Sequence, residues 1–265
     1  MKILITGAAG YIGKQLVEYL YQQNKHEIVA CDIRDDNPFT HLPKVLYSKM
    51  DIRSEEVLTE MQKRQVDVVV HLASIVTPGK KSNREFEYSV DVLGTKNLLG
   101  ACVKTNVKRI IISSSGAAYG YHPANEKWLV ETDTIRGNEQ FAYSYHKRLV
   151  EEMLVEYREK YPDLEQTIFR IGTILGRTVS NQITNLFDQR FLLGISGSKS
   201  PFVFIWDQDV VRCFAKAVDD EKTGIYNLAG DGALSVDELG VLLAKKVVKV
   251  PSSVVAAALF VLKRL

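Results

Sequence analysis

Along the first 170 residues, short apolar runs alternate with longer stretches in which apolar residues recur every three or four positions. The short runs are rich in β-branched residues, which predicts strands covered on both faces. The longer stretches have the period of amphipathic helices. This alternation predicts βαβ units that build a parallel sheet. The predicted strands span residues 2–6, 27–32, 45–49, 66–72, 108–113 and 165–171.

The regular alternation ends near residue 171. Residues 172–201 contain glycines and an amphipathic segment but no clear strand, whereas 202–205 and 225–228 predict strands around a helix over 207–219. We therefore expect a doubly wound α/β domain and a small C-terminal lobe that is either reduced or truncated. The predicted boundaries are 1–171 with 202–228 for the α/β domain, and 172–201 with 229–265 for the small lobe.

Composition excludes several classes of protein. With 46% apolar and 25% charged residues, the 265-residue chain has the average make-up of a soluble globular protein. A net charge of +2 gives no basic surface for nucleic acid or an anionic membrane. The apolar stretch over 254–262 is too short to cross a bilayer, so we expect a core or interface helix there.

The cysteines also limit the possibilities. Cys31, Cys102 and Cys213 are too scattered for a disulfide framework or a zinc site, and no other spacing indicates a metal. We therefore expect no metal, and a reducing, cytoplasmic compartment.

The first predicted strand runs into a glycine-rich turn that opens a helix. Gly7, Gly10 and Gly13 would let the backbone turn sharply and approach a pyrophosphate, whose charge is met by N–H groups at the helix start. Ala8 stands where the generic Gly-x-Gly-x-x-Gly dinucleotide motif has its second glycine. An ordinary tight turn is the alternative interpretation.

Asp32 ends the second predicted strand, about twenty residues after the turn. A carboxylate there would accept hydrogen bonds from adenosine ribose hydroxyls and repel a 2′-phosphate, which favours NAD over NADP. Arg34 and Arg53 lie nearby in sequence and weaken this discrimination. Alternatively, Asp32 only caps a loop.

Tyr143 and Lys147 lie four residues apart, on one face of a predicted helix. An isolated tyrosine titrates near about pH 10, so a tyrosine that acts as a base at neutral pH needs a positive charge beside it. Serines at 113–115 follow the fifth predicted strand, at the sheet edge where α/β folds bind ligands. Their hydroxyls could donate to a substrate oxygen.

Together these motifs resemble the extended short-chain dehydrogenases/reductases of the NAD-dependent epimerase/dehydratase family. The residues that carry the resemblance are 6–13, Asp32, Asp51 and Ile52, 71–74, 113–120, Tyr143, Lys147, 169–170, 204–210 and 225–228.

The resemblance implies a Rossmann-type NAD(P)-binding domain with a small substrate-binding lobe, and NAD as the cofactor, with NADP less favoured. It assigns catalysis to Ser115, Tyr143 and Lys147, and the adenine contact to Asp51 and Ile52. The expected cofactor-binding residues are Gly7, Ala9, Gly10, Tyr11, Ile12, Gly13, Asp32, Asp51, Ile52, Leu72, Ala73, Ser74, Ser113, Tyr143 and Lys147.

The activity implied is hydride transfer at a carbinol or carbonyl carbon, coupled to proton transfer by Tyr143. The expected substrate is a sugar or nucleotide-sugar, turned over by an epimerase or dehydratase. Members that act on nucleotide-sugars usually have an arginine and a histidine where residues 202–207 stand, and both are missing here.

Two alternatives therefore remain open. One is an NAD(P)-dependent alcohol dehydrogenase or carbonyl reductase for a less polar substrate. The other is a non-catalytic dinucleotide-binding regulator. The resemblance also implies a homodimer through the helices over 85–106 and 143–161.

Overall fold

The computed structural model describes residues 1–79, 83–198, 201–220 and 222–255. They form two compact units. The first unit comprises Met1–Gly172 and Asp207–Leu228, and the second comprises Thr173–Trp206 and the described residues from Ala229 onward. Both units are therefore discontinuous in sequence.

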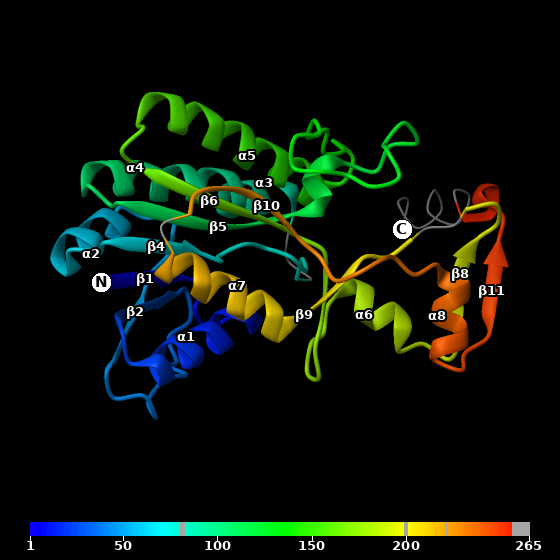
Figure 1. The fold of residues 1–265 in the computed structure, drawn as a ribbon, viewed down its shortest axis with the longest axis horizontal. Helices are drawn as coiled ribbons and strands as arrows, with labels where there is room; N and C mark the ends of the chain where they lie inside the picture. The colour runs from blue at the N-terminus through cyan, green and yellow to red at the C-terminus, as the bar shows by residue number, and fades with distance from the viewer. Residues whose placement is uncertain (80–82, 199–200, 221, 256–265) are drawn as a thin grey trace. The chain divides into compact units, whose positions relative to one another are not determined.

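A sheet of seven strands forms the centre of the first unit (Figure 1), in the order β10-β6-β5-β4-β1-β2-β3. Every neighbouring pair is parallel. The order reverses between β1 and β4, the kind of position where open α/β sheets bind ligands outside the carboxyl ends of their strands. The strands are β1 (Lys2–Thr6), β2 (Glu27–Asp32), β3 (Val45–Lys49), β4 (Val68–His71), β5 (Arg109–Ser115), β6 (Glu165–Ile171) and β10 (Gly224–Leu228).

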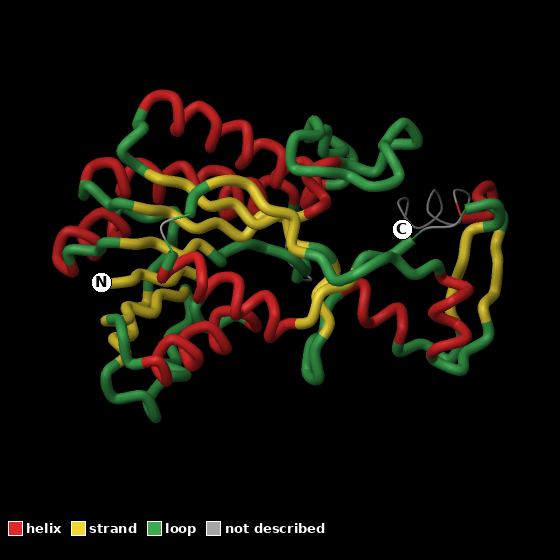
Figure 2. The backbone as a smooth tube through the Cα atoms, in the orientation of Figure 1, coloured by secondary structure: helices red, strands yellow, loops and turns green. Residues whose placement is uncertain are grey.

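Helices cover both faces of this sheet (Figures 1 and 2). On one face lie α1 (Tyr11–Gln23) and α7 (Asp207–Asp219), which pack together. On the other face lie α2 (Glu56–Arg64), α3 (Arg84–Tyr88), α4 (Thr95–Lys104) and α5 (Ala142–Lys160). A π-helical segment, η1 (Ser89–Gly94), joins α3 to α4, and a 3₁₀ turn, η2 (Gly116–Tyr119), follows β5. The doubly wound fold is confirmed.

The two helical layers explain the composition of the strands. Ile3, Leu4 and Ile5 are fully buried although they point alternately to opposite faces. Leu4 packs in a cluster with Leu98 and Leu99 of α4. Truncating such a side chain to alanine costs about 2–5 kcal/mol of folding stability. Burial on both faces of the sheet therefore holds the strands, and with them the strand ends, in fixed places.

The second unit contains strands that the sequence did not reveal. The prediction of no clear strand over 172–201 is wrong, because β7 (Thr173–Leu175) and β8 (Leu192–Ile195) lie there. Strand β7 pairs with β9 (Phe204–Trp206), and β8 pairs with β11 (Val247–Val250). These strands have three or four residues and partners far away in the chain, so no local pattern identifies them.

The pairing of β7 with β9 also changes one predicted domain boundary. Residues 202–206 were expected in the α/β domain, but β9 pairs with β7 and belongs to the second unit. The unit also contains α6 (Gln182–Phe187) and α8 (Val236–Leu242), and each has a side-chain capping box at its N-terminus.

No helix among the described residues is long and apolar enough to span a membrane. Most of the helix expected over 254–262 lies outside the described residues.

Candidate functional site

The glycine-rich turn after β1 leaves no room for side chains. Gly7 has φ +67°, and a Cβ there would stand 2.7 Å from the backbone nitrogen of Ala73. A Cβ at Gly13 would stand 2.3 Å from the Gly7 carbonyl oxygen. The turn therefore needs glycine both for its backbone angle and for the close approach of α1.

This turn fits a pyrophosphate. The N-cap residue of α1, Gly10, has no capping side chain, so the positive end of the helix dipole is not covered by a carboxylate or hydroxyl of its own cap. Backbone N–H groups at such a helix start can meet the charge of a phosphate. The predicted dinucleotide contacts at Ala9, Tyr11 and Ile12 belong to this same turn and helix start.

Tyr11 also connects the turn to a distant helix. Its hydroxyl donates to Asp207 Oδ2 at 2.6 Å, and Asp207 is the first residue of α7. Only 5% of the Asp207 surface is exposed. The Asp207 carboxylate thus holds the N-terminal end of α1 against α7, a contact that sequence reasoning did not find.

Asp32 holds the glycine-rich turn as well. Its Oδ2 accepts from the backbone N–H of Ala9 at 2.9 Å, and its Oδ1 accepts from the N–H of Arg34 at 3.2 Å. The Arg34 guanidinium in turn donates to the Ala9 carbonyl at 2.9 Å. Asp32 is therefore at the predicted sheet edge, but the ribose contact remains a prediction.

The Asp51 carboxylate accepts hydrogen bonds from Arg53, among them Nε to Oδ1 at 3.0 Å and Nη2 to Oδ2 at 2.6 Å. These hydrogen bonds from Arg53 hold the pKa of the Asp51 carboxyl below its ordinary value. The guanidinium also lies 5.1 Å from the centre of the Phe86 ring. Neighbouring Ile52 is buried, so the predicted adenine contacts lie on an ordered loop after β3.

A chain of buried hydrogen bonds runs through His71 at the end of β4. Thr6 Oγ1 lies 2.7 Å from His71 Nδ1, and His71 Nε2 lies 2.9 Å from Thr95 Oγ1. Burial lowers the pKa of His71 to about 3, with a smaller contribution from the positive charge of Lys147. His71 is therefore a hydrogen-bonded core residue.

The predicted catalytic lysine lies between β5 and the predicted base. Lys147 Nζ donates to the Ser113 carbonyl oxygen at 2.8 Å and lies 5.6 Å from the centre of the Tyr143 ring. Lys147 is 7% exposed. The ammonium and the phenol ring therefore lie side by side at the carboxyl end of β5.

Ser115 ends β5 and begins η2. Its Oγ accepts from the N–H of Ala117 at 3.1 Å. Helix α5 docks onto the same turn through Ser144, whose Oγ donates to the Ala117 carbonyl at 2.6 Å. Ala117 thus contacts both Ser115 and the neighbour of Tyr143, which ties the two predicted catalytic side chains to a single turn.

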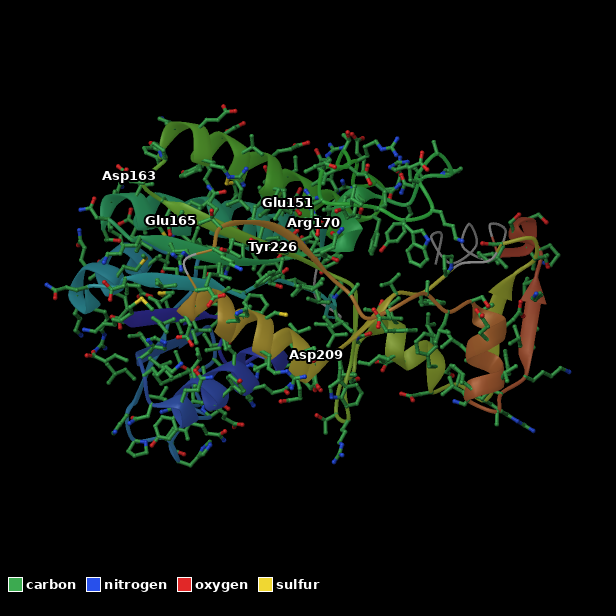
Figure 3. All side chains as sticks on the ribbon, viewed as in Figure 1. Glu151, Asp163, Glu165, Arg170, Asp209 and Tyr226 are labelled. Atoms are coloured by element: carbon green, nitrogen blue, oxygen red, sulfur yellow. The ribbon has the colours of Figure 1, made fainter. Side chains whose placement is uncertain are left out.

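A buried ion pair fixes α5 to β6. Figure 3 shows Glu151 and Arg170 next to each other, and the Arg170 Nη2 atom lies 2.7 Å from Glu151 Oε2. Arg170 also donates to the Tyr119 hydroxyl at 2.9 Å and to the Glu131 carbonyl at 3.0 Å. Arg170 therefore forms an ion pair and also anchors the loop after η2.

Among the described residues, no group of three or more histidine, cysteine or acidic side chains could hold a metal ion.

Comparison with families gives one match over most of the chain. Residues 3–229 match the sequence model of the NAD dependent epimerase/dehydratase family.

Individual relatives have different activities. UDP-glucuronic acid decarboxylase 6 from Arabidopsis thaliana is 27% identical over 90% of this chain and 72% of its own length. D-erythronate dehydrogenase from Haemophilus influenzae is 30% identical over 60% of this chain and 51% of its own. Among solved structures, Thermus thermophilus UDP-glucose 4-epimerase in complex with NAD superimposes with a TM-score of 0.77 at 25% identity, covering 95% of this chain and 86% of that one.

Proposed function

Because the chain belongs to the NAD-dependent epimerase/dehydratase family, we propose that it oxidises and reduces a carbinol carbon of a sugar or nucleotide-sugar with Tyr143 as the base. The observation that carries this proposal is the Lys147 ammonium, which lies 5.6 Å from the centre of the Tyr143 ring at the carboxyl end of β5. The relatives that act on UDP-sugars support the substrate class.

The residues around the glycine-rich turn would hold the cofactor. Gly7, Gly10 and Gly13 would surround the pyrophosphate, Asp32 would bind the adenosine ribose, and Asp51 with Ile52 would contact the adenine. The backbone around Leu72, Ala73, Ser74 and Ser113 would line the path to the nicotinamide. The start of α1 supports this placement, because its N-cap residue Gly10 has no capping side chain and the positive end of the helix dipole favours a phosphate there.

The protein's own groups would move the proton. When bound, NAD supplies hydride exchange at its nicotinamide ring. Tyr143 would remove the hydroxyl proton of the substrate, and the Ser115 hydroxyl would donate to the same oxygen. Lys147, held by Ser113, would stabilise the phenolate and donate to the nicotinamide ribose. In the reverse direction, Tyr143 would return its proton to the oxygen.

A dehydrogenase for a less polar substrate is the second candidate. It is favoured by the absence of arginine and histidine from residues 202–207, and by the similarity to D-erythronate dehydrogenase. We expect the second unit to supply the substrate contacts in either case.

The two candidates differ in how NAD is used. We would incubate purified protein with UDP-glucose, UDP-glucuronic acid and D-erythronate, and follow NADH absorbance together with product analysis. Turnover of a UDP-sugar without added NAD and without net NADH supports the epimerase or dehydratase. Stoichiometric NADH supports the dehydrogenase. NAD binding without redox activity on any substrate would contradict both and favour a non-catalytic regulator.

We also propose a homodimer through the helical layer of α3, η1, α4 and α5. Phe86, Leu93 and Val155 are 42%, 48% and 44% exposed there, so their apolar side chains could pack against a second copy of the chain. Sedimentation as a dimer at micromolar concentration is the expected result, and a monomer would contradict it.

A cytoplasmic location remains a prediction, supported by three free cysteines.

A further inference from the structure

Asp91 lies in the π-helical segment η1 and is 3% exposed. Its Oδ1 accepts from the backbone N–H of Ile75 at 2.9 Å, and its Oδ2 lies 3.3 Å from His146 Nδ1. Its main-chain oxygen accepts from Thr95 Oγ1 at 2.5 Å. One buried residue therefore contacts the loop after β4, the helix α5 and the helix α4.

Asp91 is ionised in this environment. Burial favours the neutral carboxyl, but the hydrogen bond with His146 and the positive charge of Lys147 outweigh it, so the pKa of Asp91 lies below its ordinary value. An ionised carboxylate only accepts hydrogen bonds, so His146 carries a proton on Nδ1. His146 is itself 1% exposed and lies between Tyr145 and Lys147 on α5.

The main-chain oxygen of Asp91 extends the connection to β1. Thr95 Oγ1 donates its proton to Asp91, so it must accept from His71 Nε2–H. His71 Nδ1 is then unprotonated and accepts from Thr6 Oγ1. Thr6 Oγ1 in turn lies 3.4 Å from the backbone N–H of Ala73. Each hydrogen bond in this chain has a single direction.

The two sets of hydrogen bonds meet the same loop. Thr6 connects one set to the backbone N–H of Ala73, and Asp91 Oδ1 accepts directly from the N–H of Ile75. The backbone is therefore held on both sides of Ser74. Through His146 they reach the helix that carries Tyr143 and Lys147. These are the two parts of the site that must keep a fixed relation for hydride and proton transfer to occur together.

We propose that Asp91 is a positioning residue, which holds the loop after β4 and the helix α5 in one geometry through Ile75 and His146. The proposal rests on the proposed function, because it assigns this loop to the cofactor and this helix to the base.

The cost of the arrangement supports a role beyond packing. A buried carboxylate carries a desolvation penalty of several kcal/mol, and apolar residues of similar volume are often as stable. Here the negative charge also balances the buried ammonium of Lys147. The segment that carries Asp91 is π-helical, and such irregular turns occur mostly at functional sites.

Three variants separate these contacts. Asp91→Ala removes both side-chain hydrogen bonds. Asp91→Asn keeps an amide oxygen for the Ile75 N–H, and its amide N–H can donate to His146 Nδ1 when the neutral ring carries its proton on Nε2 instead. His146→Phe keeps a ring of similar size but removes the hydrogen bond between Asp91 and α5. Leu154→Ala, a fully buried position on the same helix, is the control for loss of stability alone.

The readouts are the NAD⁺ dissociation constant by calorimetry, kcat and KM on the substrate that the protein turns over, and the thermal midpoint. We expect Asp91→Ala to raise the NAD⁺ dissociation constant at least tenfold and Asp91→Asn to restore it to within about threefold of wild type. His146→Phe should lower kcat at least tenfold and leave NAD⁺ binding within about threefold, because the Ile75 contact remains. Leu154→Ala should lower the thermal midpoint without raising the NAD⁺ dissociation constant or lowering kcat.

Two results would overturn the proposal. One is equal NAD⁺ affinity in Asp91→Ala and wild type. The other is equal loss of affinity in Asp91→Ala, Asp91→Asn and Leu154→Ala, which would reduce Asp91 to a stability role. If Asp91→Ala does not fold, the split between NAD⁺ affinity and kcat in His146→Phe decides. Wild-type protein that binds no NAD⁺ would instead contradict the proposed function, so the two failures are distinguishable.

Discussion

Lys147 Nζ lies 5.6 Å from the centre of the Tyr143 ring while it donates to the Ser113 carbonyl oxygen at 2.8 Å. The carbonyl belongs to the last residues of β5, so the strand end fixes the position of the amine beside the phenol. Because Lys147 is buried, little water screens its charge. The arrangement therefore places a buried amine beside a phenol ring at the edge of the sheet.

Gly13→Ala should weaken both the fold and cofactor binding. The added Cβ would stand 2.3 Å from the Gly7 carbonyl oxygen, a backbone atom that cannot move without distorting the turn. We expect the free energy of unfolding to fall by about 1–3 kcal/mol. The NAD⁺ dissociation constant should rise at least tenfold, measured by calorimetry.

Gly100→Ala is the matched control, since Gly100 is also helical but a Cβ there would meet no atom within 4 Å. It should raise the free energy of unfolding by about 0.5–1 kcal/mol and leave NAD⁺ affinity unchanged. Equal NAD⁺ affinity in both variants would show that the turn does not hold the dinucleotide.

Glu151→Leu should strongly destabilise the first unit. Arg170 is only 5% exposed, and the substitution removes the carboxylate that pairs with its guanidinium. Breaking a buried pair in this way costs about 3–5 kcal/mol. Urea unfolding measures the loss. In Lys249→Met, which removes the exposed pair with Asp237, the loss should be at most about 1 kcal/mol; similar losses in the two variants would contradict the structural role of Arg170.

His71 should make stability depend on pH in the acid range. The pKa of His71 in the folded protein is about 3, below the value of about 6.5 expected for the unfolded chain. Protonation therefore favours the unfolded chain. The neutral ring contributes fully above about pH 6.5, and stability is lost as the pH falls toward 3, by up to about 1.4 kcal/mol per pH unit.

Urea midpoints of wild type and His71→Gln, measured from pH 7.5 to 4.5, test this dependence. The difference in stability between the two proteins should shrink as the pH falls, because glutamine does not titrate. A constant difference over this range would mean that His71 is not buried as a neutral ring.

The first unit could be predicted from the sequence because its strands are visible as short apolar runs. Residues 3–5 are all apolar and the glycine-rich turn follows at once, so strand, turn and helix are each visible locally. The helix over Asp207–Asp219 was predicted with the bounds that the structure has. By contrast, β8 has only four residues and is defined by its distant partner β11.

The contacts inside the site were harder to predict than its residues. The sequence places Asp32 at a strand end, but its hydrogen bond to the Ala9 N–H depends on how the turn folds back. Asp91 gave no signal, because a single acidic residue within a helical pattern normally faces solvent. Only the three-dimensional arrangement shows that it meets Ile75 and His146.

The most direct test of the account is the turnover of Tyr143→Phe. We predict that kcat falls at least about 100-fold, as expected for loss of a general base, while the NAD⁺ dissociation constant stays within about threefold of wild type. Tyr145→Phe, two residues away on α5, should keep nearly full activity. If Tyr143→Phe bound NAD⁺ normally and retained more than half of the wild-type kcat, proton transfer would not depend on this phenol and the central claim would be wrong.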